Sequence, residues 1–559
     1  MKYTDPPFNE VSIDMKERHF SRREFLWIAS LGAVAMKSGC LQQVNRHFPT
    51  KKRLNIIFLL TDDQRARTFS VSDHPVIKTP NLDWLALNGV RFTNAFVTDP
   101  TCMPSRVTFL TGLYERVHGV GFSSEHVLTQ KQWSYTYPAL LRENGYYTGF
   151  IGKFGVERYP FRGSGLKGFD FWRGHDGWAS FFPKTQTNCQ IYKDSKGDII
   201  TPIMGESMER FLDSCPEDKP FCLSVSFSAP HGSISGSMVP EEGGGDKRMT
   251  RPANENIRLQ DHPVYGKLYR DSNIDIPIEC GTDTDSHIPT YVLRQEGRRQ
   301  TYSYNYTKET CLEHHYRYYQ LITGVDRAVG QLLDSLKKRG LNNNTVIIFS
   351  SDHGLLMGEY GMGGKALLYD LTTKIPLIIY DPTLPKSKRG KENDALVVST
   401  DVAPTILEYA GIRPPEFIQG QSLIKLIYDL ESNWRTDIFL ENLYTGRFNP
   451  LIEAVREKNW KYVRYFSNPG HSKGREVLTR SGYYVDEDVD FQDKVPVYEQ
   501  LFDLETDPYE GRNLATSSEY AEILNRLRKR CELHSSQIMV EKEKYRMALK
   551  KRFNCKFLR

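Results

Sequence analysis

The chain has 559 residues, which is long enough for one large domain and a smaller one. Its 74 basic and 69 acidic residues leave a net charge of only +5, which excludes the strongly basic surface typical of nucleic-acid-binding proteins. No apolar run approaches the ~20 residues that a transmembrane helix needs.

The first fifty residues have the pattern of a bacterial export signal. The twin arginine Arg22-Arg23 precedes a short apolar core that ends in the small residues Ala33–Ala35. This order predicts export by the twin-arginine route to the periplasm or the cell exterior, the alternative being a chance Arg-Arg before a buried helix. Cys40 is a candidate for a lipid-anchored cysteine. Residues 1–50 are therefore set aside as signal and linker.

Four short apolar runs predict the strands of a central sheet. Runs of this length without charged residues are typical of strands that are covered on both faces. A helix is predicted over Glu313–Lys338, because its apolar residues fall on one face. Since strands and helices alternate, the sequence predicts an α/β fold with a mostly parallel sheet. The predicted strands are Leu54–Leu60, Phe221–Ser228, Thr345–Ser351 and Pro376–Tyr380.

Polar side chains follow three of these strands. Asp62 and Asp63 come after the first strand, His231 follows the second, and Asp352 and His353 follow the third. Ligands of open α/β sheets bind outside the carboxyl ends of the strands, so we expect these side chains to converge. The alternative is that each aspartate only caps a helix or turn.

The composition divides the chain into a large α/β domain over residues 51–430 and a smaller α+β domain over 431–559. Within the first, residues 233–305 form a polar insert, a possible substrate loop. Within the second, Trp460–Phe466 alternates like an antiparallel strand, and Glu499–Ala515 indicates a strand, a turn and then a helix.

The insert contains three arginines that are candidates for contact with an anionic polysaccharide. A run of charge is as readily a solvated face, so this alternative stays open. The residues are Arg294, Arg298 and Arg299.

The segment "TCMPSRVTFLTG" places Cys102 where a loop enters a helix. Pro104 suits the first turn of a helix, and a helix N-terminus attracts anions. Arg106 adds a planar fork for a tetrahedral oxyanion. The aspartates at the strand ends would need a hard cation nearby, for which Ca²⁺ is preferred and Mg²⁺ is the alternative. His353 is an unusual neighbour for calcium.

Other interpretations of this cysteine fit less well. Cys102 and Arg106 are separated by three residues, whereas cysteine phosphatases use a Cys-x5-Arg loop. A thiolate ligand suits zinc or copper better than a carboxylate site. A buried structural cysteine would leave the acids and Arg106 without explanation.

The segment "CMPSRVTFLTG" resembles the signature of the sulfatase family, Cys-x-Pro-Ser-Arg followed by Leu-Thr-Gly. Further segments match in order: "IIFLLTDDQR", "GYYTGFIGKFG", "PFCLSVSFSAPHG", "SSDHGLLMGEYGMGGKALLYD" and "LFDLETDPYEGRNLA". The resemblance covers most of residues 52–515. It implies an alkaline-phosphatase-like fold with a smaller C-terminal antiparallel sheet, and it points to carbohydrate sulfatases, including iduronate-2-sulfatase-like members.

The resemblance also implies the chemistry of a sulfuric ester hydrolase. The cysteine would be converted to Cα-formylglycine by a formylglycine-generating enzyme or an anaerobic sulfatase-maturing enzyme. Its hydrated form attacks sulfur and later collapses to expel sulfate. Arg106, Lys153 and Lys365 would offset charge on the sulfate oxygens, and His231 or Lys365 would protonate the leaving alcohol. The implied metal ligands are Asp62, Asp63, Cys102, Asp352 and His353.

One departure from the family pattern matters. Many sulfatases carry a histidine shortly after the Gly-Lys lysine, but Lys153 is followed by Phe154, Gly155 and Val156. The base for sulfate release is therefore open, with His118 and His175 as candidates. Two rival functions also remain: a phosphodiester or phosphonate hydrolase on the same fold, and an inactive protein that binds sulfated glycans.

Overall fold

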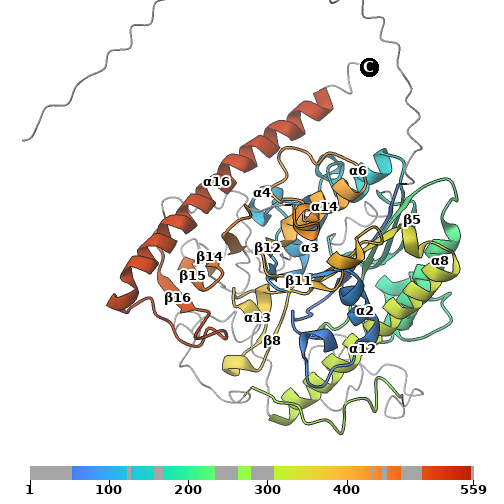
Figure 1. Ribbon diagram of the computed structural model, residues 1–559, viewed down its shortest axis with the longest axis horizontal. Helices are drawn as coiled ribbons and strands as arrows, with labels where there is room; N and C mark the ends of the chain where they lie inside the picture. The colour runs from blue at the N-terminus through green and yellow to red at the C-terminus, as the bar shows by residue number, and fades with distance from the viewer. Residues whose placement is uncertain are drawn as a thin grey trace, which may run out of the picture. The chain divides into compact units, whose positions relative to one another are not determined.

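A computed structural model shows the chain from Arg53 onward as one compact unit (Figure 1). The structure describes residues 53–122, 127–156, 168–177, 179–232, 262–277, 308–430, 433–443, 450–466 and 494–554. The predicted export signal with Cys40, and the insert arginines Arg294, Arg298 and Arg299, lie outside the described residues.

An eight-stranded sheet forms the centre of this unit, in the order β11-β2-β10-β7-β1-β6-β4-β5. β1 pairs in parallel with β6 and β7, and β4 pairs in parallel with β5 and β6, whereas β10 runs antiparallel to both of its neighbours. The predicted mostly parallel sheet is thus confirmed. The strands are β1 Asn55–Thr61, β2 Val90–Phe92, β4 Tyr147–Lys153, β5 Phe171–His175, β6 Phe221–Ser226, β7 Thr345–Ser351, β10 Leu377–Tyr380 and β11 Lys391–Asn393.

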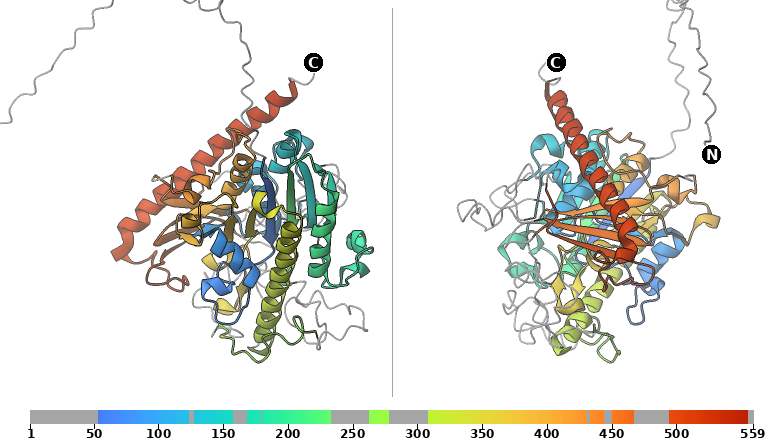
Figure 2. Two further views of the ribbon diagram at one scale, coloured as in Figure 1. Left: turned by 45° about the vertical axis from the view of Figure 1, so that its right-hand side comes forward. Right: turned by 90° about the vertical axis from the view of Figure 1, so that its left-hand side faces the viewer.

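Helices cover both faces of this sheet, as Figures 1 and 2 show. Side chains of β1 alternate between two apolar cores: Ile57 and Leu59 pack with α2, α8 and α12, while Ile56, Phe58 and Leu60 pack with α3, α6 and α14. This two-sided burial explains why β1 has no polar residue between Ile56 and Leu60. The helices are α2 Pro80–Asn88, α3 Cys102–Thr111, α4 Glu115–His118, α5 Gln130–Trp133, α6 Tyr137–Glu143, α8 Ile200–Ser214, α12 Lys308–Lys338, α13 Asp370–Thr373, α14 Val402–Tyr409, α15 Ile424–Ile427 and α16 Ala521–Asn554.

The described part of the polar insert, residues 262–277, contains turns and no helix or strand. Val264, Tyr265, Tyr269 and Ile274 are nevertheless buried. Tyr265 packs against Phe181, and the Tyr269 hydroxyl pairs with Thr323 of α12 at 2.7 Å. This stretch is therefore anchored to the large domain.

A second, antiparallel sheet lies within the predicted C-terminal domain. Its strands pair in chain order, β13 Asp437–Asn442, β14 Leu451–Glu457, β15 Trp460–Phe466 and β16 Tyr498–Asp503. Helix α16 lies across this sheet (Figure 2). The expected strand and turn after Glu499 are present, but the expected helix does not begin by Ala515: α16 starts at Ala521. Among the described residues, no helix is both long and apolar enough to cross a bilayer.

Two further pairs of short strands lie near the site described below. β3 Ala95–Phe96 pairs in parallel with β12 Val397–Val398. β8 Leu356–Met357 and β9 Gly363–Gly364 form a hairpin directly after β7.

Candidate active site

Adjacent parallel strands bring the predicted acids to one edge of the sheet. β1 and β7 run in register from Asn55↔Thr345 to Thr61↔Ser351, so the residues that follow them leave the sheet side by side. The backbone continues this pairing, because the Asp352 amide donates to the Thr61 carbonyl at 3.0 Å. Asp62, Asp63 and Asp352 are all at most 1% exposed. The predicted convergence of these strand ends is therefore observed.

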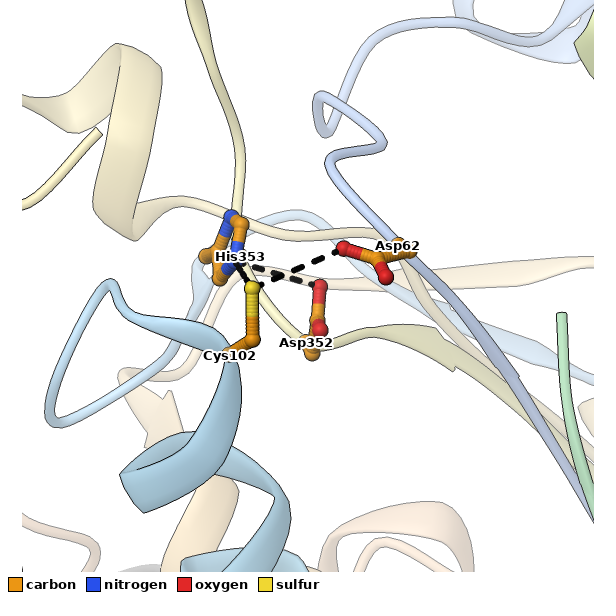
Figure 3. Close-up of side chains that lie close together, drawn as sticks. All are labelled: Asp62, Cys102, Asp352 and His353. Carbon is orange, nitrogen blue, oxygen red and sulfur yellow. Dashed lines mark hydrogen bonds and ion pairs between the residues drawn. The ribbon is translucent and has the colours of Figure 1, made fainter. Parts of the chain in front are cut away.

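Cys102 is the first residue of α3 and points at these acids (Figure 3). Its Sγ lies 3.8 Å from Asp62 Oδ1 and 3.3 Å from His353 Nε2. Four ligand atoms, one each from Asp62, Cys102, Asp352 and His353, lie within 4.8 Å of one another. The thiol and the strand-end acids thus occupy the same small space.

Three cationic side chains surround this space. Lys365 Nζ lies 2.8 Å from both Cys102 Sγ and Asp63 Oδ1. Arg106 Nε donates to Asp352 Oδ2 at 3.0 Å, and the ammonium of Lys153, the last residue of β4, pairs with Asp62. Each predicted cation therefore has a carboxylate partner.

The electrostatics of the cluster reflect this crowding of charges. Burial disfavours the Cys102 thiolate, but Lys153 and Lys365 outweigh it and hold the pKa of the thiol well below its usual value. Burial and the nearby Asp62 raise the pKa of Asp352 to about 6, even though Arg106 is in contact with it. Negative charge on Asp352 is thus not fully offset by the side chains around it.

These observations fit a hard divalent cation. The donors are mainly carboxylate oxygens, which suit Ca²⁺ or Mg²⁺. Asp63 Oδ2 is buried and lacks a hydrogen-bond partner among the described residues. Added positive charge would also stabilise the ionised form of Asp352, whose pKa is raised. Asp62 belongs to both groups of potential ligands, with Cys102, Asp352 and His353 in one and with Asp63 and His231 in the other. The residues present can therefore hold such an ion.

Besides His353, the three other candidate histidines occupy different places. His231 Nε2 lies 3.7 Å from Asp63 Oδ2, at the edge of the acid cluster. His175 ends β5 beside Lys153, its register partner, and its Nε2 lies 3.2 Å from Ser228 Oγ. His118 ends α4, its Nδ1 accepts a hydrogen bond from the Val120 amide, and its Nε2 lies 3.3 Å from Thr108 Oγ1 of α3. Its position is that of a structural histidine.

Several supporting residues were not among the predicted site residues, although Ser105, Gly155 and Ser226 lie within the segments that resemble the family. Ser226, at the end of β6, accepts a hydrogen bond from the Arg106 guanidinium, and Ser105 Oγ donates to the Asp352 carbonyl at 2.5 Å. Gly155 has a φ of +64°, and a Cβ there would lie 3.0 Å from Arg106 Cδ. Both the positive φ and the close approach of the Arg106 side chain therefore favour glycine at position 155.

A buried pair of carboxyl groups flanks α3: Asp99 precedes this helix, and Glu115 is the first residue of α4. Their side chains are hydrogen-bonded to each other, and the hydroxyl of Thr101, the residue before Cys102, donates to Asp99. Burial raises the pKa of Asp99 to about 6 and that of Glu115 well above its usual value, with Glu441 adding to both shifts. The pair therefore shares a proton at neutral pH.

We expect Glu115→Gln to remove part of the pH dependence of stability. A carboxyl group with a raised pKa in the folded state stabilises most below its unfolded pKa and loses that contribution as pH rises. For Glu115 the loss begins near 4.5 and continues upward. Between pH 5 and 8, wild type should lose roughly 1–3 kcal/mol of unfolding free energy relative to Glu115→Gln. Urea unfolding at both pH values measures this.

The exposed Glu408 on α14 provides the control. Glu408→Gln should follow the wild-type pH dependence. Equal pH slopes for wild type and Glu115→Gln would show that the pair does not retain a proton in the folded protein.

Comparisons with known proteins agree with this geometry. The sulfatase family model matches residues 54–412. The models "N-sulphoglucosamine sulphohydrolase, C-terminal" and "C-terminal region of aryl-sulfatase" match residues 358–477 and 437–556. An arylsulfatase of Clostridium perfringens is 28% identical over 526 residues, which is 85% of this chain and 93% of that protein. An N-acetylglucosamine-6-O-sulfatase of Bacteroides thetaiotaomicron is 27% identical over 526 residues, 84% of each chain.

Solved structures show the same fold. A protein in complex with its substrate D-glucosamine-2-N,6-O-disulfate has a TM-score of 0.66 at 22% identity, covering 87% of this chain and 98% of that chain. A phosphonate monoester hydrolase of Agrobacterium radiobacter has a TM-score of 0.64 at 20% identity, covering 88% and 96%. The expected alkaline-phosphatase-like fold is confirmed. Because the family model spans well over half of the chain, and because its signature cysteine lies among the strand-end acids, the chain belongs to the sulfatase family and is a sulfuric ester hydrolase.

Proposed function

We propose that the protein hydrolyses sulfate esters of carbohydrates, with Cys102 converted to formylglycine and with Ca²⁺ at the acid cluster. The observation that carries this proposal is the convergence of Cys102 with Asp62, Asp352 and Lys365 in one buried cluster. A carbohydrate substrate is supported by the names of relatives, among them the N-acetylglucosamine-6-O-sulfatase of Bacteroides thetaiotaomicron and a human N-acetylglucosamine-6-sulfatase.

The exposure of the cluster members indicates where the substrate enters. Among the charged side chains, Lys365, Lys153 and His231 keep 15%, 10% and 9% of their side-chain surface, whereas those of Asp62 and Asp352 keep none. The sulfate group would therefore meet the lysines first, with their ammonium groups on its oxygens. His231 at the same open side is placed to give a proton to the departing alcohol.

The groups that the structure does not contain would complete the site. Hydrated formylglycine at position 102 supplies a nucleophilic hydroxyl, and a divalent cation supplies charge that favours its deprotonation. Asp62, Asp63 and Asp352 would hold the cation, with His353 as a further neighbour. Arg106 mainly holds other groups of the site in place, because its guanidinium binds Asp352, Ser226 and the Lys153 carbonyl.

His175 is our candidate for the proton acceptor in sulfate release. This assignment rests on its position, because His175 is the register partner of Lys153. Burial, with Lys153 and Arg106 nearby, lowers the pKa of His175 to about 3, so the imidazole is neutral at physiological pH and would need added negative charge beside it to take up a proton. The packing of His118 behind α3 makes it a poor alternative.

Substrate selectivity tests the proposal. Protein made in a host with a formylglycine-generating enzyme should release sulfate from N-acetylglucosamine-6-sulfate and from an aryl sulfate. We expect kcat/KM for the aryl sulfate to exceed that for the matching aryl phosphonate monoester by about 100-fold or more. The reason is that relatives across most of the chain are sulfatases, whereas the likeness to the phosphonate hydrolase is one of fold.

Two outcomes would contradict this assignment. Faster turnover of the phosphonate would favour the rival hydrolase. Tight retention of sulfated sugars without release of sulfate would identify an inactive binding protein.

A further inference from the structure

The lysine nearest to Cys102 lies on a loop with an unusual backbone. Lys365 follows the β8–β9 hairpin, and the next residue, Ala366, has a φ of +79°. This left-handed conformation is disfavoured for residues with a Cβ and persists only where the surroundings impose it. Ala366 is also buried, so each polar group of its backbone needs a partner within the protein. What imposes the conformation therefore decides where Lys365 points.

Two hydrogen bonds fix the backbone of Ala366. Its amide donates to the carbonyl of Pro100, two residues before Cys102, at 3.2 Å. Its carbonyl accepts a hydrogen bond from the side-chain amide of Asn442. Because a carbonyl can only accept, the Nδ2 of Asn442 must face it. The residue after Lys365 is thus held between the loop that carries Cys102 and the C-terminal sheet.

Asn442 is well placed to act as a rigid anchor. It is the last residue of β13, is fully buried, and pairs across the strand with Ile452 of β14. The adjacent Glu441 amide donates to the Thr98 carbonyl at 2.8 Å, which ties β13 to the segment before α3. The position of Asn442 is therefore set by the sheet and not by the loop that it binds.

The other end of the same loop is anchored to the C-terminal sheet as well. The Asp370 amide donates to Glu510 Oε2 at 2.5 Å, and Lys461 Nζ of β15 binds Asp370 Oδ1 at 3.0 Å and Glu510 Oε1 at 2.6 Å. With Asp370 held independently, the bond from Asn442 to the Ala366 carbonyl is the contact by which the C-terminal sheet bears on the residue next to Lys365, beside the bond from the Ala366 amide to Pro100.

We propose that Asn442 is a positioning residue for Lys365, which it aims at residue 102 by holding Ala366 in the left-handed conformation. The C-terminal sheet thereby helps to shape the active site. The consequence for turnover rests on the proposed sulfatase function, whereas the placement of Lys365 does not.

Kinetics of Asn442→Ala test the proposal. Lys365 Nζ lies 2.8 Å from the side chain of residue 102, the proposed reacting residue. We therefore expect kcat on an aryl sulfate to fall about 10- to 100-fold, with KM changed less than about threefold. In a Lys365→Ala background, Asn442→Ala should cost no further activity, since both changes remove the same interaction. If the double variant lost activity by the product of the two single-variant factors, the proposal would be overturned.

A matched control separates positioning from folding. Asn513 also donates from its side chain to a backbone carbonyl, that of Glu499, and accepts from the Leu501 amide, and both of these partners belong to β16 and not to the Lys365 loop. Asn513→Ala should lower Tm while leaving kcat unchanged. An equal loss of kcat in both variants would mean that Asn442 is merely structural.

A glycine at position 366 provides a rescue. Glycine adopts positive φ without steric cost. Adding Ala366→Gly to Asn442→Ala should therefore raise kcat about tenfold, or up to the kcat of the single variant Ala366→Gly. No gain of kcat in the double variant would contradict the role assigned to the left-handed backbone.

Chemical labelling tests the placement without any substrate. Lys365 keeps only 15% of its side-chain surface, so it should react slowly with an acylating reagent, and mass spectrometry can follow its peptide. Asn442→Ala should speed acylation of Lys365 by about fivefold or more, and Asn513→Ala should not. Unchanged labelling would refute the positioning role even if sulfate turnover is absent, whereas absent turnover with the expected labelling would refute only the proposed function.

Discussion

Cys102→Ala should reduce kcat/KM for sulfate ester hydrolysis by about 10⁴-fold or more, because it removes the proposed nucleophile. The matured wild-type protein should show the peptide containing residue 102 at the mass of the aldehyde and not of the thiol. Alanine is smaller than cysteine and the position is only 6% exposed, so the variant should fold with little change. Initial rates on an aryl sulfate and peptide mass spectrometry provide the two measurements.

The control for this experiment is Cys215→Ala. Cys215 follows α8, is only partly buried, and bonds the Phe211 carbonyl far along the chain from the signature. Its loss should leave turnover intact. Full activity in Cys102→Ala, or an unconverted thiol in an active preparation, would remove the basis for the proposed reaction.

Asp62→Asn should abolish metal binding and lower kcat/KM by about 10³-fold or more. Asp62 is shared by both groups of potential ligands and also pairs with Lys153 and Arg106. Asparagine keeps the shape but not the charge, so the cation would lose a charged ligand, Lys153 loses its carboxylate partner, and Arg106 keeps only Asp352. Metal analysis after dialysis against micromolar Ca²⁺, with rates measured in parallel, checks both effects.

Asp326→Asn is the matched control, since Asp326 is equally buried but receives the Asn81 and Leu82 amides at the start of α2. This change should lower Tm and leave bound metal unaltered. If Asp62→Asn retained the metal and the activity, the assignment of the acid cluster as the metal site would be wrong.

The sequence predicted the parts of the structure that depend on local pattern. The apolar runs of β1 and β7 are visible because both faces of each strand are buried, and the acids that follow them are placed by the parallel register. The direction of β10 was not predictable, because an apolar run carries no information about strand orientation. The positions of Lys153 and Lys365 were indicated only by the family resemblance.

Other site features depend on contacts between distant parts of the chain. Asn442 acts on a carbonyl 76 residues away, and its own segment has no polar pattern that marks it. Asp99 and Glu115 look like ordinary surface acids in the sequence, and only the burial of both makes them share a proton. The room that Gly155 leaves for Arg106 is likewise invisible without the fold.

The order in which the chain is made gives a time limit for modifying residue 102. All ten residues of α3 are buried. Arg106 of this helix binds Asp352, which directly follows β7 and is synthesised 246 residues after Arg106. At about 5–20 residues per second, roughly 10–50 s of synthesis separate the emergence of these two partners. During that interval the cysteine is still accessible on a nascent chain whose central strand lacks its β7 neighbour. For the proposed conversion of Cys102, this interval is the shortest time that a maturation enzyme would have before the site can close, and slower elongation between the two segments would favour complete conversion.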